Sequence, residues 1–247
     1  MKCIDDVQVG RRLGQMQKKR KQNNLNTALE LGMSQSRYSR LKNGIVTVTI
    51  DELRKICSVY EWTAQYALFG QFAQVSSPVF DGIGHLDEHG KRRCLKMLAC
   101  SIDRGNVAKE FRDHPMYKLF MDGLLERIPE NTVDVLPYVL KYEKDKNGYK
   151  RNQMLEILEI TRFKWDAIMQ GVTPGEVSLL LRIEEKFGYD IHFLVNNQIP
   201  ANDFFDRLLI KQTGRRERIL VLFDEIQKFG EQEYLVEMQG RNQRGYR

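Results

Sequence analysis

The sequence predicts an all-α protein that contains two related helical modules. Apolar residues recur at helical spacing along most of the 247 residues. Residues that favour helix N-caps, such as Ser34 and Thr49, precede several of these periodic segments. The pattern of the first half also recurs in the second, because Leu13 falls on Leu140 and Gly44 falls on Gly171. Together these observations favour tandem helical modules over a β sandwich.

Five short helices are expected in residues 1–70. Gly32 ends the second helix, and Ser34 is the N-cap of a third helix over residues 35–42. Residues 45–50 have strand propensity, but they lack a partner strand nearby and are expected to form an extended loop. The apolar positions expected to mark the first two helices are Val7, Val9, Leu13 and Met16, then Leu25, Ala28, Leu29 and Leu31.

Thr49 and Glu52 have the spacing of a capping box, which predicts that the fourth helix begins here. Thr63 is expected to begin the fifth. Beyond a looser connector, the apolar spacing predicts helices from Leu86 to Asp103 and from Pro115 to Arg127. The predicted domains are residues 1–70, a helical connector over 71–129, a second module over 130–195, and C-terminal helices with a basic tail over 196–247.

The second module repeats the apolar skeleton of the first at an offset of 127 residues. Helix, short helix, capped helix and glycine stop recur in the same order, so the chain is expected to hold two related modules. The matched positions are Leu13 and Leu140, Ala28 and Leu155, Leu31 and Leu158, Met33 and Ile160, Ser34 and Thr161, Tyr38 and Trp165, Leu41 and Ile168, and Gly44 and Gly171.

All of the excess positive charge lies near the N-terminus. The whole chain carries a net charge of +6, whereas residues 1–45 alone hold ten basic and three acidic side chains. A localised basic face is typical of proteins that bind a polyanion. The alternative is a solvated basic helix without a partner.

Several other classes of protein are not expected. No apolar run approaches the roughly 18 residues that span a bilayer, and the first residues have no apolar signal core, so a cytoplasmic location without membrane attachment is expected. The cysteines form no C-x-x-C pair and are expected to be reduced thiols. No cofactor motif is present, and neither a cofactor nor an enzymatic activity is expected. The cysteines are Cys3, Cys57, Cys94 and Cys100.

Residues 85–89 have the pattern H-x-x-E-H, which occurs in one class of zinc peptidases. Two histidines four positions apart on a helix can bind zinc with a nearby carboxylate. Gly90 follows the pattern at once, and Asp87 and Glu88 also suit the first turn of a helix. We therefore expect no metal site here.

Residues 31–44, with the sequence LGMSQSRYSRLKNG, carry the most specific motif of the chain. They resemble the helix-turn-helix core of the phage-repressor (Cro/XRE-type) family, and the resemblance extends over residues 5–70. It implies a lambda-repressor-like five-helix module that binds double-stranded DNA and regulates transcription. In this family the start of the third helix enters the major groove, which implies that Gln35, Ser36 and Ser39 contact bases.

The residues themselves support this interpretation. Met33, Tyr38 and Leu41 are spaced to anchor the third helix on a core. Glutamine can bond adenine with two hydrogen bonds, and Arg and Lys reach guanine or phosphate. The simpler alternative is a helical hairpin with a polar surface. The predicted DNA-binding residues are Lys18, Lys19, Lys21, Asn24, Ser34, Gln35, Ser36, Arg37, Ser39, Arg40, Lys42 and Asn43.

The chain departs from the family pattern at the second helix. The family has Thr-Gln at its start and a Leu three residues after the Gln, where this chain has Asn23, Asn24 and Thr27. Asn24 can still donate a hydrogen bond to phosphate over a shorter reach. Thr27 is expected to weaken the core anchor.

The second module loses much of the DNA-binding surface. Glu159 replaces the turn glycine, Asp166 replaces a serine, and residues 130–172 carry seven basic and seven acidic side chains. We expect a copy that keeps the fold and has a shifted function: pairing with the first module, dimerisation, or holding a regulatory ligand. Arg162 and Lys164 leave a secondary role in DNA binding or at an interface open.

The sequence therefore predicts a sequence-specific DNA-binding regulator of transcription that uses the helix at 35–42. The alternative is a protein-interaction or assembly module, or a regulator of another complex. A homodimer on a two-fold site is expected, because one recognition helix contacts few base pairs. The rival is a monomer whose two modules both contact DNA. A peptide or protein effector is left open.

Overall fold

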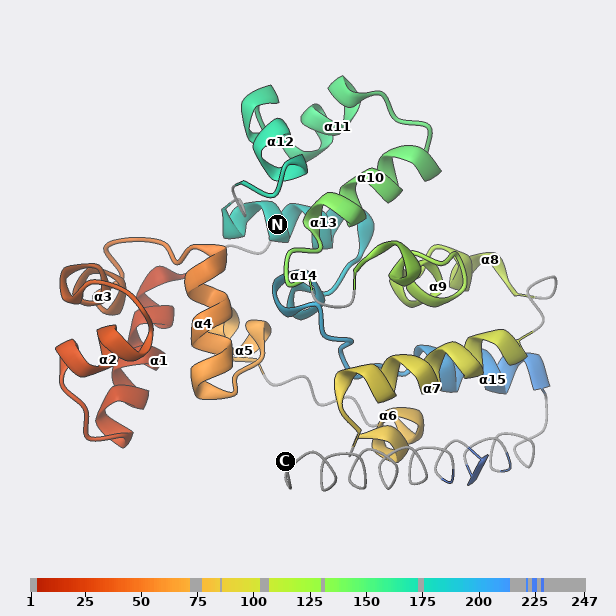
Figure 1. The fold of residues 1–247 in the computed structure, drawn as a ribbon, viewed down its shortest axis with the longest axis horizontal. Coiled ribbons are helices and arrows are strands. Elements are labelled where there is room, and N and C mark those ends of the chain that lie inside the picture. The colour runs from red at the N-terminus through yellow and green to blue at the C-terminus, as the bar shows by residue number, and fades with distance from the viewer. Residues whose placement is uncertain are drawn as a thin grey trace, which may run out of the picture. The chain divides into compact units, whose positions relative to one another are not determined.

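In the computed structural model, residues 4–71, 77–84, 86–102, 107–129, 132–172 and 176–213 are described, together with positions 221, 224, 225 and 228. Within these residues every regular element is a helix and none is a strand, which confirms the predicted all-α fold class (Figure 1). Residues 45–48 form the expected loop, and Thr49 makes one isolated antiparallel bridge with Glu176. No described helix is both long and apolar enough to cross a membrane.

The chain divides into two compact units, and each is assembled from two separate stretches. Unit 1 contains residues 1–73 and 128–198, whereas unit 2 contains residues 74–127 and 199–247.

The first stretch of unit 1 folds into five helices. Side chains cap these helices as the sequence predicts: Ser34 accepts a hydrogen bond from the backbone N–H of Arg37, and Thr49 and Glu52 form a complete capping box. The predicted third helix, over residues 35–42, is confirmed. The helices are α1 (Asp6–Lys19), α2 (Asn24–Glu30), α3 (Gln35–Lys42), α4 (Ile50–Tyr60) and α5 (Ala64–Phe69).

The α1 and α3 helices approach each other closely at Gly10. A Cβ atom at this position would lie 2.2 Å from the carbonyl oxygen of Lys42, so only glycine fits without a backbone shift. Leu13, Tyr38 and Leu41 are fully buried around this contact. The close packing fixes the direction of α3 relative to the rest of the module.

The apolar spacing of the first two helices predicts only some of the residues that are buried in the core. Val9, Leu13, Ala28 and Leu31 are buried as predicted, but Leu25 and Leu29 are 48% and 68% exposed, and Val7 also faces solvent. Thr27 is buried in place of a larger apolar residue, and its hydroxyl donates to the carbonyl oxygen of Asn23. Leu25 and Leu29 are four positions apart and therefore share one face of α2, which is the face turned to solvent.

The second stretch of unit 1 also folds into five helices: α10 (Leu136–Lys146), α11 (Arg151–Leu158), α12 (Arg162–Met169), α13 (Val177–Phe187) and α14 (Ile191–Asn196). Helices α12, α13 and α14 begin and end 127 positions after α3, α4 and α5, and α11 begins 127 positions after α2. The buried residues Leu140, Leu158, Trp165 and Ile168 stand at the positions of Leu13, Leu31, Tyr38 and Leu41.

The left-handed backbone positions of unit 1 follow the same register. Five pairs of positions that are 127 residues apart have positive φ in both stretches, and in four of these pairs only one member is glycine. Such positions fix the turns between helices, because few side chains tolerate them. The pairs are Lys21 and Gly148, Gly32 and Glu159, Gly44 and Gly171, Glu61 and Gly188, and Gly70 and Asn197.

Unit 2 contains α6 (Pro78–Ile83), α7 (Glu88–Ser101), α8 (Lys109–Arg112), α9 (Pro115–Phe120), a 3₁₀ turn η2 (Leu125–Arg127) and α15 (Phe204–Thr213). The expected helix from Pro115 to Arg127 is wrong in extent. It stops at Phe120 because Gly123 adopts a positive φ of 73° before η2. Phe204 stacks on His114 and meets Phe111 edge to face, which ties α15 to the earlier stretch.

Several sequence-based expectations lie outside the described residues. These are Cys3, His85, Asp103 at the end of the predicted 86–103 helix, and most of the basic tail in residues 196–247.

Candidate nucleic-acid interface

A tight turn joins α2 to α3. Gly32 has a φ of 63°, a left-handed conformation that glycine adopts without steric cost. The N–H of Met33 donates to the carbonyl oxygen of Ala28 over 2.9 Å, so the end of α2 stays hydrogen-bonded within the turn. Ser34 then caps α3, and its hydroxyl is occupied by this role.

The α3 helix has one buried and one exposed face. Tyr38 and Leu41 are fully buried, and burial raises the pKa of the Tyr38 phenol to about 12. On the opposite face Gln35, Ser36 and Arg40 are exposed and Ser39 is half-buried. Thus three of the six residues of this helix that are predicted to contact DNA are exposed to solvent.

Arg37 is held against the protein. Its guanidinium donates to both carboxylate oxygens of Glu52, from Nε over 2.7 Å and from Nη2 over 2.8 Å, and Nη2 also donates to the carbonyl oxygen of Thr47. The hydrogen bonds to Glu52 raise the pKa of Arg37. Burial opposes ionisation of Glu52, but hydrogen bonds from Arg37 and Thr49 still keep its pKa below the usual value. The pair therefore joins the start of α3 to the start of α4.

Lys42 belongs to a polar network that joins α1, α2 and α3. Its ammonium donates to Asn24 Oδ1 over 2.8 Å and to Gln17 Oε1 over 3.3 Å, and Gln17 Nε2 also donates to Asn24 Oδ1. Tyr38 donates to Gln17 Oε1 as well. Because its oxygen accepts these bonds, Asn24 can direct its amide N–H groups outward. Sequence reasoning missed Gln17, which is 7% exposed and central to this network.

A basic edge follows directly on this network. Lys18, Lys19 and Lys21 are exposed, and within the described residues none of them forms an ion pair. Neighbouring Arg20 differs, because it pairs with Glu30 over 2.6 Å and lies over the Tyr60 ring. Gln17 fixes this end of α1 beside Asn24 at the start of α2, so the three lysines follow directly on the polar network. Asn43, the C-cap of α3, is also exposed.

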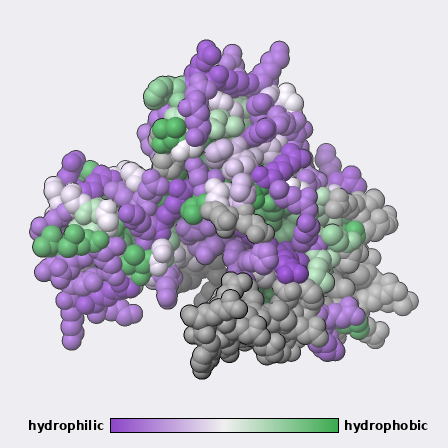
Figure 2. Space-filling model, viewed as in Figure 1, coloured by the Kyte–Doolittle hydropathy of each residue, from purple (hydrophilic) through white to green (hydrophobic). Residues whose placement is uncertain are grey.

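The corresponding helix of the second stretch, α12, has a different surface. Lys164 pairs with Glu176 over 2.6 Å, and Asp166 pairs with Arg151. Arg162 is exposed, and within the described residues it forms no ion pair. Phe163 is 82% exposed. In Figure 2 hydrophobic atoms interrupt the mostly hydrophilic surface over α12 and over α2–α3.

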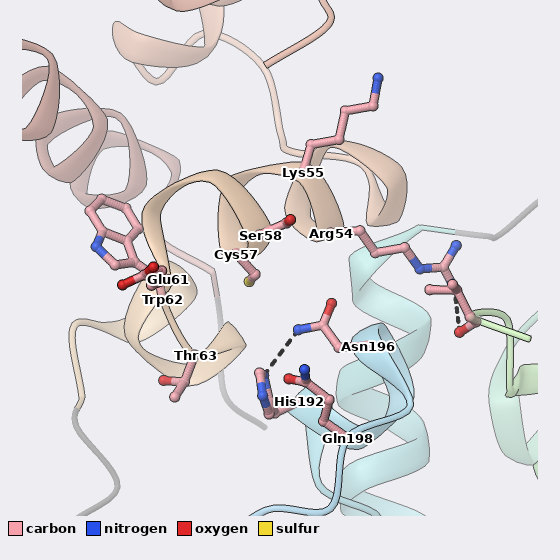
Figure 3. A pocket seen from close by; sticks show the side chains of 11 residues that line it. Arg54, Lys55, Cys57, Ser58, Glu61, Trp62, Thr63, His192, Asn196 and Gln198 are labelled. Atoms are coloured by element: carbon pink, nitrogen blue, oxygen red, sulfur yellow. Dashed lines mark hydrogen bonds between the residues drawn. The ribbon is translucent and has the colours of Figure 1, made fainter. Parts of the chain in front are cut away.

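Unit 1 also contains a cavity of about 650 Å³ between α4, α5 and α14 (Figure 3). Polar and apolar groups both line it: Lys55 and Trp62 come from one side, and His192 and Asn196 from the other. Burial lowers the pKa of His192, which accepts a hydrogen bond from the backbone N–H of Ala64. Sequence reasoning did not find this cavity because its walls are more than a hundred residues apart in the chain.

The H-x-x-E-H segment uses its carboxylates for local structure. Asp87 caps α7, and Glu88 accepts hydrogen bonds from the N–H of Ile199 over 2.7 Å and from Arg92 over 3.3 Å. His85 lies outside the described residues. In the part of the chain that the structure describes, no group of three or more His, Cys, Asp and Glu side chains could hold a metal ion.

Comparison with protein families gives one match: a model described as helix-turn-helix matches residues 16–64. The match runs from the end of α1 to the first residue of α5 and includes both α3 and the turn that precedes it. Searches of curated proteins and of solved structures find no match. The chain thus contains a helix-turn-helix domain.

Proposed function

We propose that this chain, which contains a helix-turn-helix domain of the kind found in DNA-binding regulators, is a sequence-specific regulator of transcription. The observation that carries the proposal is the two-sided character of α3. Tyr38 and Leu41 anchor the helix, while Gln35 and Ser36 are exposed together on its first turn. A helix presented in this way fits the major groove of B-DNA.

The exposed groups have the chemistry that base recognition needs. Gln35 can form two hydrogen bonds with adenine, and Ser36 can donate to or accept from several base edges. Arg40 can reach a guanine or a phosphate. Ser39 is less exposed and supports the same surface from the next turn.

Phosphate contacts are assigned to the basic edge and to its amide neighbours. Lys18, Lys19 and Lys21 supply charge, and Asn24 and Asn43 supply hydrogen-bond donors. Lys42 contributes its charge from within the network with Gln17. Arg37 and Ser34 hold α3 in place and need not touch DNA in this proposal. The activity is binding, and it requires no cofactor.

Two further features of the proposal rest on the second stretch of unit 1. We infer that α10–α14 are a second, divergent copy of the helix-turn-helix module, because the helix bounds, buried positions and left-handed residues share one register. The homodimer expected from the sequence stays a prediction. Its rival is a monomer in which both modules of one chain contact DNA.

The alternative function is a protein-interaction or assembly module. The exposure of Phe163 favours it, since exposed aromatic side chains are common at protein interfaces.

Selection from a random pool of double-stranded DNA separates the two functions. The full chain is expected to enrich a defined sequence, and its affinity should fall steeply between low and physiological salt because counterions are released from DNA. A shuffled version of the enriched sequence is the control. Failure to retain any DNA at low salt would overturn the proposed function.

A further inference from the structure

Equivalent residues of the two modules face each other within unit 1. Thr49, the N-cap of α4, pairs in an antiparallel bridge with Glu176, the N-cap of α13, and these residues occupy the same position in the shared register. A contact between equivalent positions is the mark of a two-fold arrangement.

The contact between α5 and α14 follows the same rule. Gln65 donates to the carboxylate of Asp190 over 2.5 Å, and the backbone N–H of Ala64 donates to His192 Nδ1 over 3.4 Å. Gln65 and His192 are themselves equivalent in the register, as are Thr63 and Asp190. The start of α5 therefore meets the start of α14, as the two halves of a symmetric pair do.

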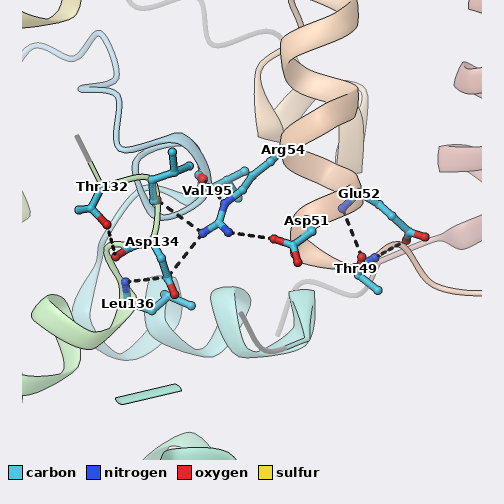
Figure 4. A network of polar contacts seen from close by, with 9 residues as sticks. Thr49, Asp51, Glu52, Arg54, Thr132, Asp134, Leu136 and Val195 are labelled. Atoms are coloured by element: carbon cyan, nitrogen blue, oxygen red, sulfur yellow. Dashed lines mark hydrogen bonds and ion pairs between the residues drawn. The ribbon is translucent and has the colours of Figure 1, made fainter. Parts of the chain in front are cut away.

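Arg54 strengthens this contact from α4. Its Nε donates to the carbonyl oxygen of Val195 over 2.8 Å, and its Nη2 lies 3.5 Å from Asp134 (Figure 4). The α4–α5 face of the first module is thus covered by the second module of the same chain. A second chain cannot use this face without displacing α14.

The register also brings α12 into the role that α3 has in the first module. Arg162 stands at the position of Gln35, and Phe163 stands at the position of Ser36. Both side chains are exposed, while Trp165 and Ile168 anchor the helix. Arginine bonds guanine through N7 and O6, and a phenylalanine ring can pack against the thymine methyl group.

We propose that α12 is a second recognition helix, so that one chain contacts two unlike half-sites, the first through Gln35 and Ser36 and the second through Arg162 and Phe163. This inference rests on the proposed function of α3. The second module would add sequence preference but little positive charge. Asp145 and Gly148 stand at the positions of Lys18 and Lys21, and only Lys146 matches a lysine, Lys19. Linkage in one chain compensates for that weakness, since the second contact forms at a high effective concentration.

The test compares DNA sequences selected from a random pool by the wild type, Phe163→Ala and Gln35→Ala. The wild type is expected to enrich two unlike half-sites with one chain bound per DNA, as measured by light scattering of the complex. Phe163→Ala should lose preference in one half-site, by on the order of 10-fold at the affected base pair. Gln35→Ala should lose preference only in the other half-site.

The salt dependence and two further variants act as controls. The slope of affinity against salt should be unchanged in Phe163→Ala, because this residue carries no charge. Met97→Ala, which truncates a side chain that is 48% exposed in unit 2, should select the wild-type sequence. Arg162→Ala provides a second probe of α12 and should change the same half-site as Phe163→Ala.

The outcomes separate the two proposals. If Gln35→Ala changes the selected sequence but Phe163→Ala and Arg162→Ala do not, α12 is not a recognition helix and the proposed function of α3 stands. A palindromic site occupied by two chains would also overturn the inference alone. Absence of any selected sequence for the wild type would overturn the proposed function itself.

Discussion

The guanidinium of Arg37 and the carboxylate of Glu52 form a two-pronged ion pair, with N–O distances of 2.7 and 2.8 Å. Glu52 also accepts a hydrogen bond from the backbone N–H of Thr49, so a single carboxylate serves both the N-cap of α4 and the side of α3. The orientation of α3 therefore depends on a charge pair and not only on its buried residues. This arrangement favours a positioning role for Arg37.

Breaking this pair should lower stability more than removing a neighbouring exposed arginine. We expect Arg37→Ala to reduce the free energy of unfolding by about 1–3 kcal/mol, because Glu52 loses two charged hydrogen bonds in a partly buried site. Arg40→Ala, on the exposed face of the same helix, should change it by less than about 0.5 kcal/mol. Urea denaturation of both variants, together with a cycle that includes Glu52→Gln, measures the coupling. Equal effects of the two arginine variants would contradict the expectation.

Gln35→Ala should relax base preference at one position of the bound site. The expected cost is about 1–3 kcal/mol for the preferred base pair, because two hydrogen bonds to its edge are removed. Competition binding with DNA duplexes that differ at single base pairs measures the effect. Asn26→Ala, an exposed amide in the first turn of α2, is the matched control. Wild-type preference in the Gln35 variant would place the recognition surface elsewhere.

Replacing Lys18, Lys19 and Lys21 with Gln should weaken binding to all DNA sequences alike. The slope of log affinity against log salt should become shallower by about 0.9 for every phosphate that the variant no longer neutralises. Gel shifts at several salt concentrations give the slope. The same replacement at Lys91, Lys96 and Lys109 in unit 2 removes equal charge and should leave the slope nearly unchanged. A similar change in both variants would indicate that only net charge matters.

Acidification should destabilise unit 2 through His114. Burial, followed by the charges of Arg207 and Lys118, lowers the pKa of His114 to about 4, whereas an unfolded chain has a value of about 6.5. Between these two values the unfolded chain binds a proton that the folded chain does not, so stability is lost as the pH falls through this window. Since the ring is only partly buried, the loss between pH 7 and pH 5 should be about 1–2 kcal/mol.

His114→Asn isolates this effect. Asparagine can keep the acceptor for the N–H of Met116, which His114 Nδ1 provides over 3.2 Å, but it does not titrate. Urea denaturation followed by circular dichroism at pH 7 and pH 5 should show a smaller loss in the variant. His192 shifts in the same direction and contributes equally to both proteins. An identical pH dependence in the two proteins would exclude His114 as the cause.

Local features of the fold could be predicted from the sequence. The bounds of α3 and the start of α4 depend on residues a few positions apart, because Ser34, Thr49 and Glu52 satisfy backbone groups in their own helix. Periodicity is less reliable for the short α2, where Leu25 and Leu29 face solvent. It also misplaces the C-terminal limit of α9, because Gly123 interrupts a segment whose apolar pattern continues.

The sequence predicts which residues of α3 face solvent, but it does not predict which of them are held by contacts with distant parts of the chain. Gln35 and Ser36 follow from the spacing of the buried positions in α3. In the sequence, Arg37 and Lys42 look like DNA contacts because they are basic residues of α3. Their intramolecular partners, Glu52 and Gln17, come from other helices, so the sequence did not reveal these contacts. The joining of unit 2 from two distant stretches likewise depends on packing between Phe204 and His114, which no local pattern contains.

The matched left-handed positions of the two modules offer a route to engineering the chain from its own sequence. Lys21 and Glu61 occupy left-handed turns where the second stretch has Gly148 and Gly188. Conversely, Glu159 and Asn197 occupy left-handed turns where the first stretch has Gly32 and Gly70. Each stretch therefore has glycine at two turns where the other holds a strained side chain. Copying those glycines across should relieve about 1 kcal/mol at each turn, less the entropy that glycine adds to the unfolded chain. Each stretch of unit 1 thus serves as a structural template for substitutions in the other.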